Sequence, residues 1–311
     1  MFRDHEESQS WELFHLNVSS FIPIISPQYQ RQRPPQFVQK CLQYLAMAPY
    51  DFNAPDADVI LRSSDGEELR AHRLILNLAS PVFQGMFSLP QPTDPLPQTP
   101  TIDIPEPFDT LRPFIQHLYP RSPPKISDIS MWAAIYTIAD KYDAEMVTDL
   151  LRDMLIPRFL ETSPLRVYAL ASRWGLEEEA KIASRKTLTM DIFKEFPRED
   201  AELMGGGPCQ QLYLLHFNRR EAARGLVTDH PLPSTNNSSC ECLTPNYSMF
   251  VPALCGRVAT RPWITAEELY EEASRWNYPV ICSNSCRNAF RNMHAYFASL
   301  LKGISELPQT V

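Results

Sequence analysis

Two short extended runs joined by an Asp-Gly pair constrain the fold more than any other feature of the sequence. The runs ADVILRSS and EELRAHR flank Asp65-Gly66, and Asp-Gly between extended segments is a strong signal for a β-hairpin. The next stretch, LILNLASPVFQGMF, indicates a helical hairpin, in which Ser80-Pro81 fits an N-cap followed by proline at the first helical position. This segment therefore predicts a domain that contains both strands and helices.

A third strand and three further helices are expected after this block. PTIDIP alternates like a short strand, and FDTLRPFIQHLYP has apolar residues at helical spacing. Pro113 lies inside that helix and is expected to kink it or to delay its start. The runs SDISMWAAIYTIADKYDA and EMVTDLLRDMLIPRFL predict two more helices. Residues 50–160 are therefore predicted to form an α+β domain with a small sheet capped by helices.

Prolines divide the rest of the chain, which has 29 of them against 9 glycines. Because proline lacks an N–H and disfavours helix at the residue before it, its clusters indicate linkers and long loops. We expect 1–49 to be a poorly ordered N-terminal segment, in which FVQKCLQYLAM forms either a short helix or a fraying stretch. We expect 161–227 to be a helical extension and 228–311 to be a cysteine-containing helical C-terminal region.

The charge and the hydropathy pattern exclude several classes of protein. The net charge of -8 disfavours binding to phosphate backbones, so a nucleic-acid partner is not expected. No stretch of about 20 apolar residues is present, so no membrane span is expected. The N-terminus MFRDHEESQSWELF lacks the basic start and apolar run of an export signal. We therefore expect an intracellular protein, in the cytoplasm or the nucleus, with reduced thiols.

Five of the seven cysteines fall in the last quarter of the chain and raise the question of a zinc site. Zinc takes four ligands, and two close thiol pairs would supply them: Cys240, Cys242, Cys282 and Cys286. Against this, the spacings C-x-C and C-x₃-C differ from the common C-x₂-C, and Cys286 shares a helical stripe with Phe290. Core or free thiols and a redox role stay open beside zinc. Cys255 is the fifth thiol of this region, and His216, His230 and His294 are candidate fourth ligands among which nothing in the sequence selects.

No pattern of an enzyme active site is found. The sequence has no G-x-S-x-G, H-E-x-x-H, P-loop or G-x-G-x-x-G motif. We therefore expect a protein that is not an enzyme and that uses no cofactor apart from the zinc considered above.

The run from Asp56 to Phe87 resembles the start of a BTB/POZ domain. An Asp-Val strand start, the A-H-R of the second strand and L-x-L-A-S-P-V-F follow one another in the family's order. Further on, FIQHLYP and IADKYDAEMV also resemble the family, so the likeness covers roughly 50–160. The sequence DVILRSSDG and the proline-rich loop 90–107 are similar to the matching segments of BTB proteins that are abundant in mushroom-forming fungi.

The resemblance implies binding to other proteins. BTB domains pair with themselves or with other BTB domains, many dock a cullin of a ubiquitin ligase, and others recruit transcriptional corepressors. The resemblance places Asp58 and Arg73 near the dimer interface, with His72 at the same seam. The alternative is a capping Asp, a solvated Arg and a structural His. Some BTB domains exchange an extra N-terminal helix, and here its apolar face would consist of Val38, Leu42 and Leu45.

Two functions from different classes follow. The first is a dimerising adaptor or scaffold, in one variant a substrate adaptor for a cullin ligase. In that variant 161–227 supplies part of the docking surface and 228–311 recognises an unknown client. The second is a nuclear transcription-associated regulator with a zinc-ordered C-terminal module, for which Arg219-Arg220 is weak basic support.

Overall fold

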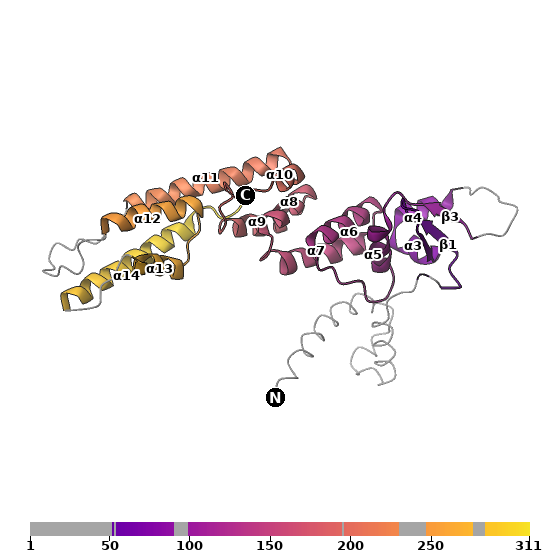
Figure 1. Cartoon of the computed structure of the whole chain (residues 1–311), viewed down its shortest axis with the longest axis horizontal. Coiled ribbons are helices and arrows are strands. Elements are labelled where there is room, and N and C mark those ends of the chain that lie inside the picture. The colour runs from indigo at the N-terminus through magenta and orange to yellow at the C-terminus, as the bar shows by residue number, and fades with distance from the viewer. Residues whose placement is uncertain (1–51, 53, 90–98, 195, 230–246, 276–283) are drawn as a thin grey trace, which may run out of the picture. The chain divides into compact units, whose positions relative to one another are not determined.

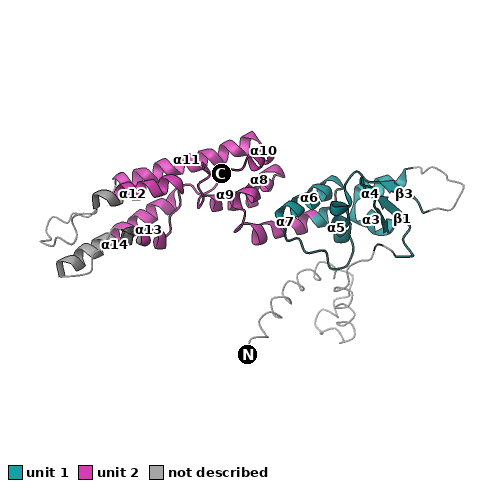
Figure 2. Cartoon of the chain, viewed as in Figure 1, with its two compact units in different colours: residues 1–147 teal, residues 148–311 magenta. Residues whose placement is uncertain are grey.

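The computed structural model describes residues 52, 54–89, 99–194, 196–229, 247–275 and 284–311 (Figure 1). Contacts within the chain divide it into two compact units, residues 1–147 and 148–311 (Figure 2). Their boundary falls inside helix α7 (Glu145–Phe159). Each unit is described by itself.

The first unit contains a three-stranded sheet with the order β2-β1-β3. Strand β1 (Val59–Arg62) pairs antiparallel with β2 (Glu68–Ala71) and parallel with β3 (Thr101–Asp103). The predicted hairpin at Asp65-Gly66 is confirmed, and Gly66 has a φ of 87°, a conformation that glycine adopts without strain.

The first unit also contains four helices, two between β2 and β3 and two after β3. Their bounds are Arg73–Ala79 for α3, Pro81–Ser88 for α4, Phe108–Leu118 for α5 and Ile129–Lys141 for α6. Because side chains alternate along a strand, β1 and β2 bury every second residue, and these join the core of the unit: Val59, Leu61, Leu69 and Ala71. The predicted α+β class is confirmed.

Ser80 fixes the start of α4 and connects it to the end of α6. Its hydroxyl accepts a hydrogen bond from the N–H of Phe83 at 3.1 Å and donates to the carbonyl of Tyr142. The ring of Tyr142 stacks on Phe83 at 4.8 Å and lies 5.7 Å from Phe114. The N-cap predicted at Ser80-Pro81 is thus confirmed, and its serine also joins segments that are distant in sequence.

Pro113 does not delay the start of α5, which begins at Phe108 and continues through the proline. The N-cap residue Pro107 has no side-chain cap of its own. Instead, the carboxylate of Asp65 in the β-hairpin accepts from the N–H of Phe108 at 3.1 and 3.3 Å. A residue from the sheet therefore caps this helix.

The described secondary structure of the second unit consists of helices joined by turns and loops. Its helices after α7 are α8 (Pro164–Arg173), α9 (Glu177–Thr187), α10 (Arg198–Met204), α11 (Gly206–Asp229), α12 (Tyr247–Thr260), α13 (Ala266–Arg275) and α14 (Asn284–Glu306). The sequence did not predict α10 or α12, because α10 has only seven residues and α12 contains Pro252 and Gly256.

Local signals set several boundaries in this unit. Gly175 has a φ of 67° and follows the end of α8, with the N–H of Leu176 bonded to the carbonyl of Ala171. A capping box begins α13, since the N–H of Glu268 donates to Thr265 Oγ1 at 3.2 Å. On α9, Lys181 Nζ lies 2.9 Å from a carboxylate oxygen of Glu178, three residues earlier.

Helices α11 to α14 enclose a core of their own, of which Leu254, Val258, Leu269 and Phe297 are members. Arg219 on α11 is buried beside it, and its guanidinium lies 5.2 Å from the ring of Trp263. That guanidinium donates at 2.7 to 2.8 Å to four backbone carbonyls, those of Pro262, Ile304, Leu307 and Pro308. Arg219 is therefore an internal brace and not part of a basic surface.

Within the ranges that the structure describes, no helix combines the length and the apolar character needed to cross a bilayer.

Candidate functional site

Helix α3 exposes two leucines on one side. Leu74 is 68% exposed and Leu78 is 81% exposed, whereas Leu76 between them is fully buried. Residues four apart lie on the same face of a helix, so Leu74 and Leu78 form one apolar strip. Single exposed apolar residues are common, but two large ones together on a seven-residue helix indicate a surface that meets another protein.

The start of α3 is held by a carboxylate from the sheet side of the unit. Asp58 Oδ1 accepts a hydrogen bond from the backbone N–H of Arg73 at 2.7 Å. The N-cap residue His72 has no side-chain cap, so Asp58 supplies that contact. The guanidinium of Arg73 donates to the carbonyl of Phe87 at 3.2 Å and lies 4.9 Å from its ring. The structure thus brings Asp58 and Arg73 together through the backbone of Arg73.

Three contacts to two residues hold His72 in place. Its backbone N–H donates to the hydroxyl of Tyr119 at 2.9 Å, and its Nδ1 lies 3.1 Å from the same oxygen. Its Nε2 lies 3.3 Å from a carboxylate oxygen of Asp56, and the hydrogen bond from His72 lowers the pKa of that carboxyl. His72 therefore helps to anchor the first turn of α3 to the residue that follows α5.

Three of the predicted interface residues meet at the beginning of the leucine strip. Asp58, His72 and Arg73 all contact the first turn of α3, while Leu74 and Leu78 continue along it. The predicted N-terminal face of Val38, Leu42 and Leu45 lies outside the described residues.

Sequence reasoning missed the leucine strip itself. The run LILNLA contains more apolar residues than one side of a short helix can bury, and that excess was the available signal. Periodicity alone did not reveal which of these residues face the core.

The predicted zinc ligands fall outside what the structure places. Cys240, Cys242 and Cys282 lie outside the described residues, and Cys286 belongs to α14 without a described side chain. In the described ranges no three His, Cys, Asp or Glu residues are arranged to hold a metal ion. Cys255 is a free thiol packed against the α11–α14 core, where burial raises its pKa.

His216, considered above as a further ligand, is buried on α11, and its Nε2 lies 3.0 Å from Thr187 Oγ1. Burial lowers the pKa of His216 to about 4, with smaller contributions from the charges of Arg220 and Arg219. This arrangement is that of a neutral core histidine.

Comparison with known proteins identifies residues 52–158. The BTB/POZ domain family model matches residues 52–158, so this part of the chain is a BTB/POZ domain. No curated protein matches the chain significantly. The match confirms the resemblance seen in the sequence. Because BTB/POZ domains are protein-interaction modules that pair with themselves or with other BTB domains, the general role of this domain is protein binding.

Proposed function

We propose that the BTB/POZ domain of this chain pairs with a second copy of itself through the exposed side of α3. The observation that carries the proposal is the leucine strip, Leu74 and Leu78. The family supplies the kind of partner, since BTB domains associate with BTB domains.

A symmetric pairing would bury the strip of each protomer against its partner. A contact across a two-fold axis uses the same patch on both chains, so each leucine counts twice. Burying one exposed leucine contributes about 1.5 to 3 kcal/mol, whereas association costs several kcal/mol in lost freedom of motion. The strip would therefore need the neighbouring surface, and Asp58, His72 and Arg73 are the proposed border residues.

The test is the mass of the full-length protein at micromolar concentration, measured by sedimentation equilibrium. We expect a dimer of two chains of 35.7 kDa each. A Leu74→Asp/Leu78→Asp variant is expected to be a monomer, because pairing would bury charges that have no partner. Ile182→Asp, at an exposed isoleucine on α9, is the matched control and should stay dimeric. A monomeric wild type, or a dimer that the double variant leaves intact, contradicts the pairing.

As a finer proposal, the protein is a substrate adaptor for a cullin ubiquitin ligase. The support is the order of the chain, in which the BTB/POZ domain is followed by a helical unit able to carry a client. The test is purification of the tagged full-length protein from its own cell, read by mass spectrometry. Near-stoichiometric cullin is the expected result. Other BTB chains or chromatin proteins in place of cullin would reject the ligase role.

The alternative function, a nuclear transcription-associated regulator, has less support. Its one basic signal was Arg219-Arg220, and the side chain of Arg219 is occupied by backbone carbonyls inside the protein. The zinc-ordered module stays a prediction, to be decided by the metal measurement described in the Discussion.

A further inference from the structure

The loop between α5 and α6 presents a serine next to two prolines. Residues 121–125 read Arg-Ser-Pro-Pro-Lys, so Ser122 is followed directly by proline and, three positions on, by Lys125. The stretch 122–127 is neither helix nor strand, and both Ser122 and Lys125 are exposed. The loop therefore offers a hydroxyl and a cation to solvent, separated by a short rigid spacer.

The main chain of this loop is extended and unpaired. Ser122 and Pro123 each precede a proline, which disfavours the helical conformation and favours an extended one. Residues 122–127, all of them described, make no hydrogen bond between main-chain groups. The fully buried side chain of Ile126 anchors the loop beyond Lys125. An enzyme can therefore take up 122–125 without breaking a main-chain hydrogen bond of the fold.

Such a segment suits the substrate cleft of a protein kinase, which binds the residues around its acceptor hydroxyl in extended form. Proline has no N–H, so it fits a kinase surface that has no acceptor at the next position, where any other residue would leave a donor unpaired. A lysine three positions on can form a charge-assisted contact with an anionic group of the kinase. Ser122, Pro123 and Lys125 match these two requirements.

The pattern is rare within the chain. Serine or threonine precedes proline at six positions, which are Ser26, Ser80, Thr99, Ser122, Ser163 and Thr244. A basic residue follows three positions after the acceptor at only two of them, Ser122 and Ser163. The sequence alone therefore leaves two candidates.

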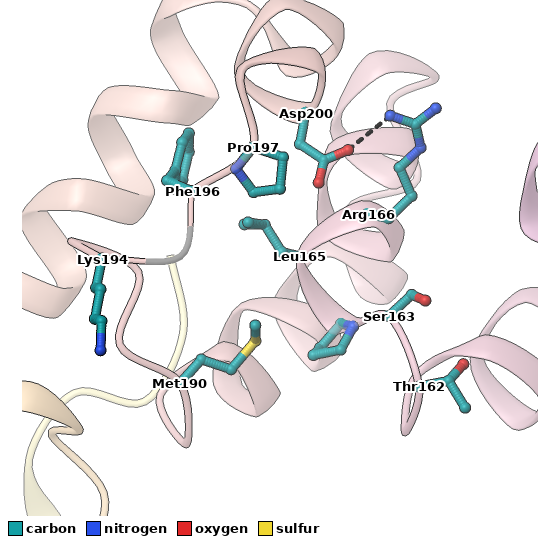
Figure 3. Close-up of a pocket in the computed structure, with 10 residues that line it drawn as sticks. Thr162, Ser163, Leu165, Arg166, Met190, Lys194, Phe196, Pro197 and Asp200 are labelled. Atoms are coloured by element: carbon teal, nitrogen blue, oxygen red, sulfur yellow. Dashed lines mark hydrogen bonds and ion pairs between the residues drawn. The ribbon is translucent and has the colours of Figure 1, made fainter.

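The structure separates Ser122 from Ser163. Pro164 begins α8, so the residues that follow Ser163 are helical. Arg166, its basic residue, lies 2.7 Å from a carboxylate oxygen of Asp200 in the wall of a cavity that Ser163 also lines (Figure 3). An extended conformation at Ser163 would require the first turn of α8 to unwind and this ion pair to break. Ser122 requires neither change.

We infer that Ser122 is a phosphorylation site for a proline-directed protein kinase. Its Oγ forms a bond to the γ-phosphorus of ATP while the bond from that phosphorus to the bridging oxygen breaks, so that ADP leaves. The hydroxyl proton passes to a base of the kinase. The product adds a charge of about -1.5 to -2 to a loop whose only charged side chains between 120 and 127 are Arg121 and Lys125. The inference does not depend on the proposed pairing or on the adaptor role.

The test uses the full-length protein, radiolabelled ATP and a cyclin-dependent kinase, an enzyme with both requirements. Mass spectrometry locates the phosphate, which we expect on Ser122, and Ser122→Ala should lose the label. In Lys125→Ala the kcat/KM of phosphorylation should fall at least about tenfold, because one charge-assisted contact is lost. The matched control Ser127→Ala removes an exposed serine from the same loop and should be phosphorylated like the wild type.

Ser163 provides a second control, for the part played by the fold. A synthetic peptide of residues 159–169 should be phosphorylated at Ser163, whereas the same serine in the folded chain should not be. Phosphate on Ser163 of the folded protein in place of Ser122 would contradict the selection made by the structure.

The inference is overturned by an unlabelled Ser122 in the wild type or by an unchanged kcat/KM in Lys125→Ala. Protein purified from its own cell with phosphatase inhibitors should also carry phosphate on Ser122, and its absence there would overturn the site. The Leu74→Asp/Leu78→Asp variant separates this site from the proposed pairing. It should be phosphorylated as the wild type is, even if the wild type itself proves to be a monomer.

Discussion

The Nε2 atom of His216 on α11 lies 3.0 Å from the Oγ1 atom of Thr187 at the end of α9. The Thr187 hydroxyl donates to the carbonyl of Ser184, so its oxygen accepts the proton of Nε2. The Nδ1 atom of His216 is buried and has no hydrogen-bond partner among the described residues. The site thus fits the neutral imidazole and opposes its protonation.

This geometry predicts a loss of stability in acid. The pKa of His216 is lowered to about 4 by burial, below its ordinary value of 6.5. The unfolded chain therefore takes up the proton first as the pH falls below 6.5. The stabilisation is complete above that pH and is lost progressively down to about pH 4, by about 3 kcal/mol in total.

Urea unfolding between about pH 7 and about pH 4 checks this prediction. His216→Gln removes the titrating group, so its stability should fall less steeply with pH than that of the wild type. Thr187→Val should lower stability at every pH. Parallel pH profiles for the wild type and His216→Gln would rule out the assignment.

Arg219 is predicted to be the most costly single charged side chain to remove from the second unit. In Arg219→Met, four carbonyls lose a charged donor in a buried site, and we expect a loss of about 3 kcal/mol or more. Arg219→Lys should recover only part of it, because an ammonium cannot reproduce the planar guanidinium. Burial lowers the pKa of Arg219 to about 10, so the side chain stays charged at neutral pH.

Hydrogen exchange measures this loss of stability residue by residue. Amides of 304–311 should lose protection in Arg219→Met, since Arg219 holds that segment. Arg224→Met removes an exposed arginine from the same helix and is the control. Equal protection in both variants would show that the segment does not depend on Arg219.

Asp58 is predicted to have a structural role that can be separated from its role in pairing. Asp58→Ala removes the acceptor for the N–H of Arg73 and should destabilise the first unit by about 1 kcal/mol. Asp58→Asn keeps an acceptor and should keep most of the stability. If the carboxylate also takes part in pairing, Asp58→Asn and Arg73→Ala should weaken the dimer in sedimentation. An unchanged dimer mass in both variants would show that Asp58 caps α3 and takes no part in pairing.

The two interpretations of the cysteine cluster predict different metal contents. Zinc bound by Cys240, Cys242, Cys282 and Cys286 predicts about one equivalent in protein purified under reducing conditions. Cys240→Ser/Cys242→Ser should then lose it, whereas Cys209→Ser, at a free thiol in α11, should not. Core or free thiols predict metal-free protein, and metal retained in the double variant would reject this ligand set.

The sequence predicted those parts of the fold that depend on neighbouring residues. The Asp65-Gly66 turn and the N-cap at Ser80 each need only a few adjacent side chains. Helix α12 was missed because its Pro252 and its glycine obscure the helical pattern, although packing against α11 and α13 stabilises it.

The candidate sites were predicted less completely, for a physical reason. Asp58 and Arg73 were identified, but their contact proved to run through the backbone N–H of Arg73. Periodicity marks Leu74 and Leu78 as apolar without showing whether their own chain covers them. The burial of Arg219 depends on acceptors 43 to 89 positions away along the chain, which no local pattern encodes.

The contacts of Arg219 also impose an order on folding during synthesis. A ribosome that has just added Arg219 must add 85 more residues before Ile304 exists as an acceptor. At about 5 to 20 residues per second, this takes roughly 4 to 17 s. During that interval the guanidinium lacks its acceptors, so α11 cannot complete its packing against α14. The BTB/POZ domain, whose hairpin strands pair within a few positions, can fold on the ribosome well before the second unit is complete.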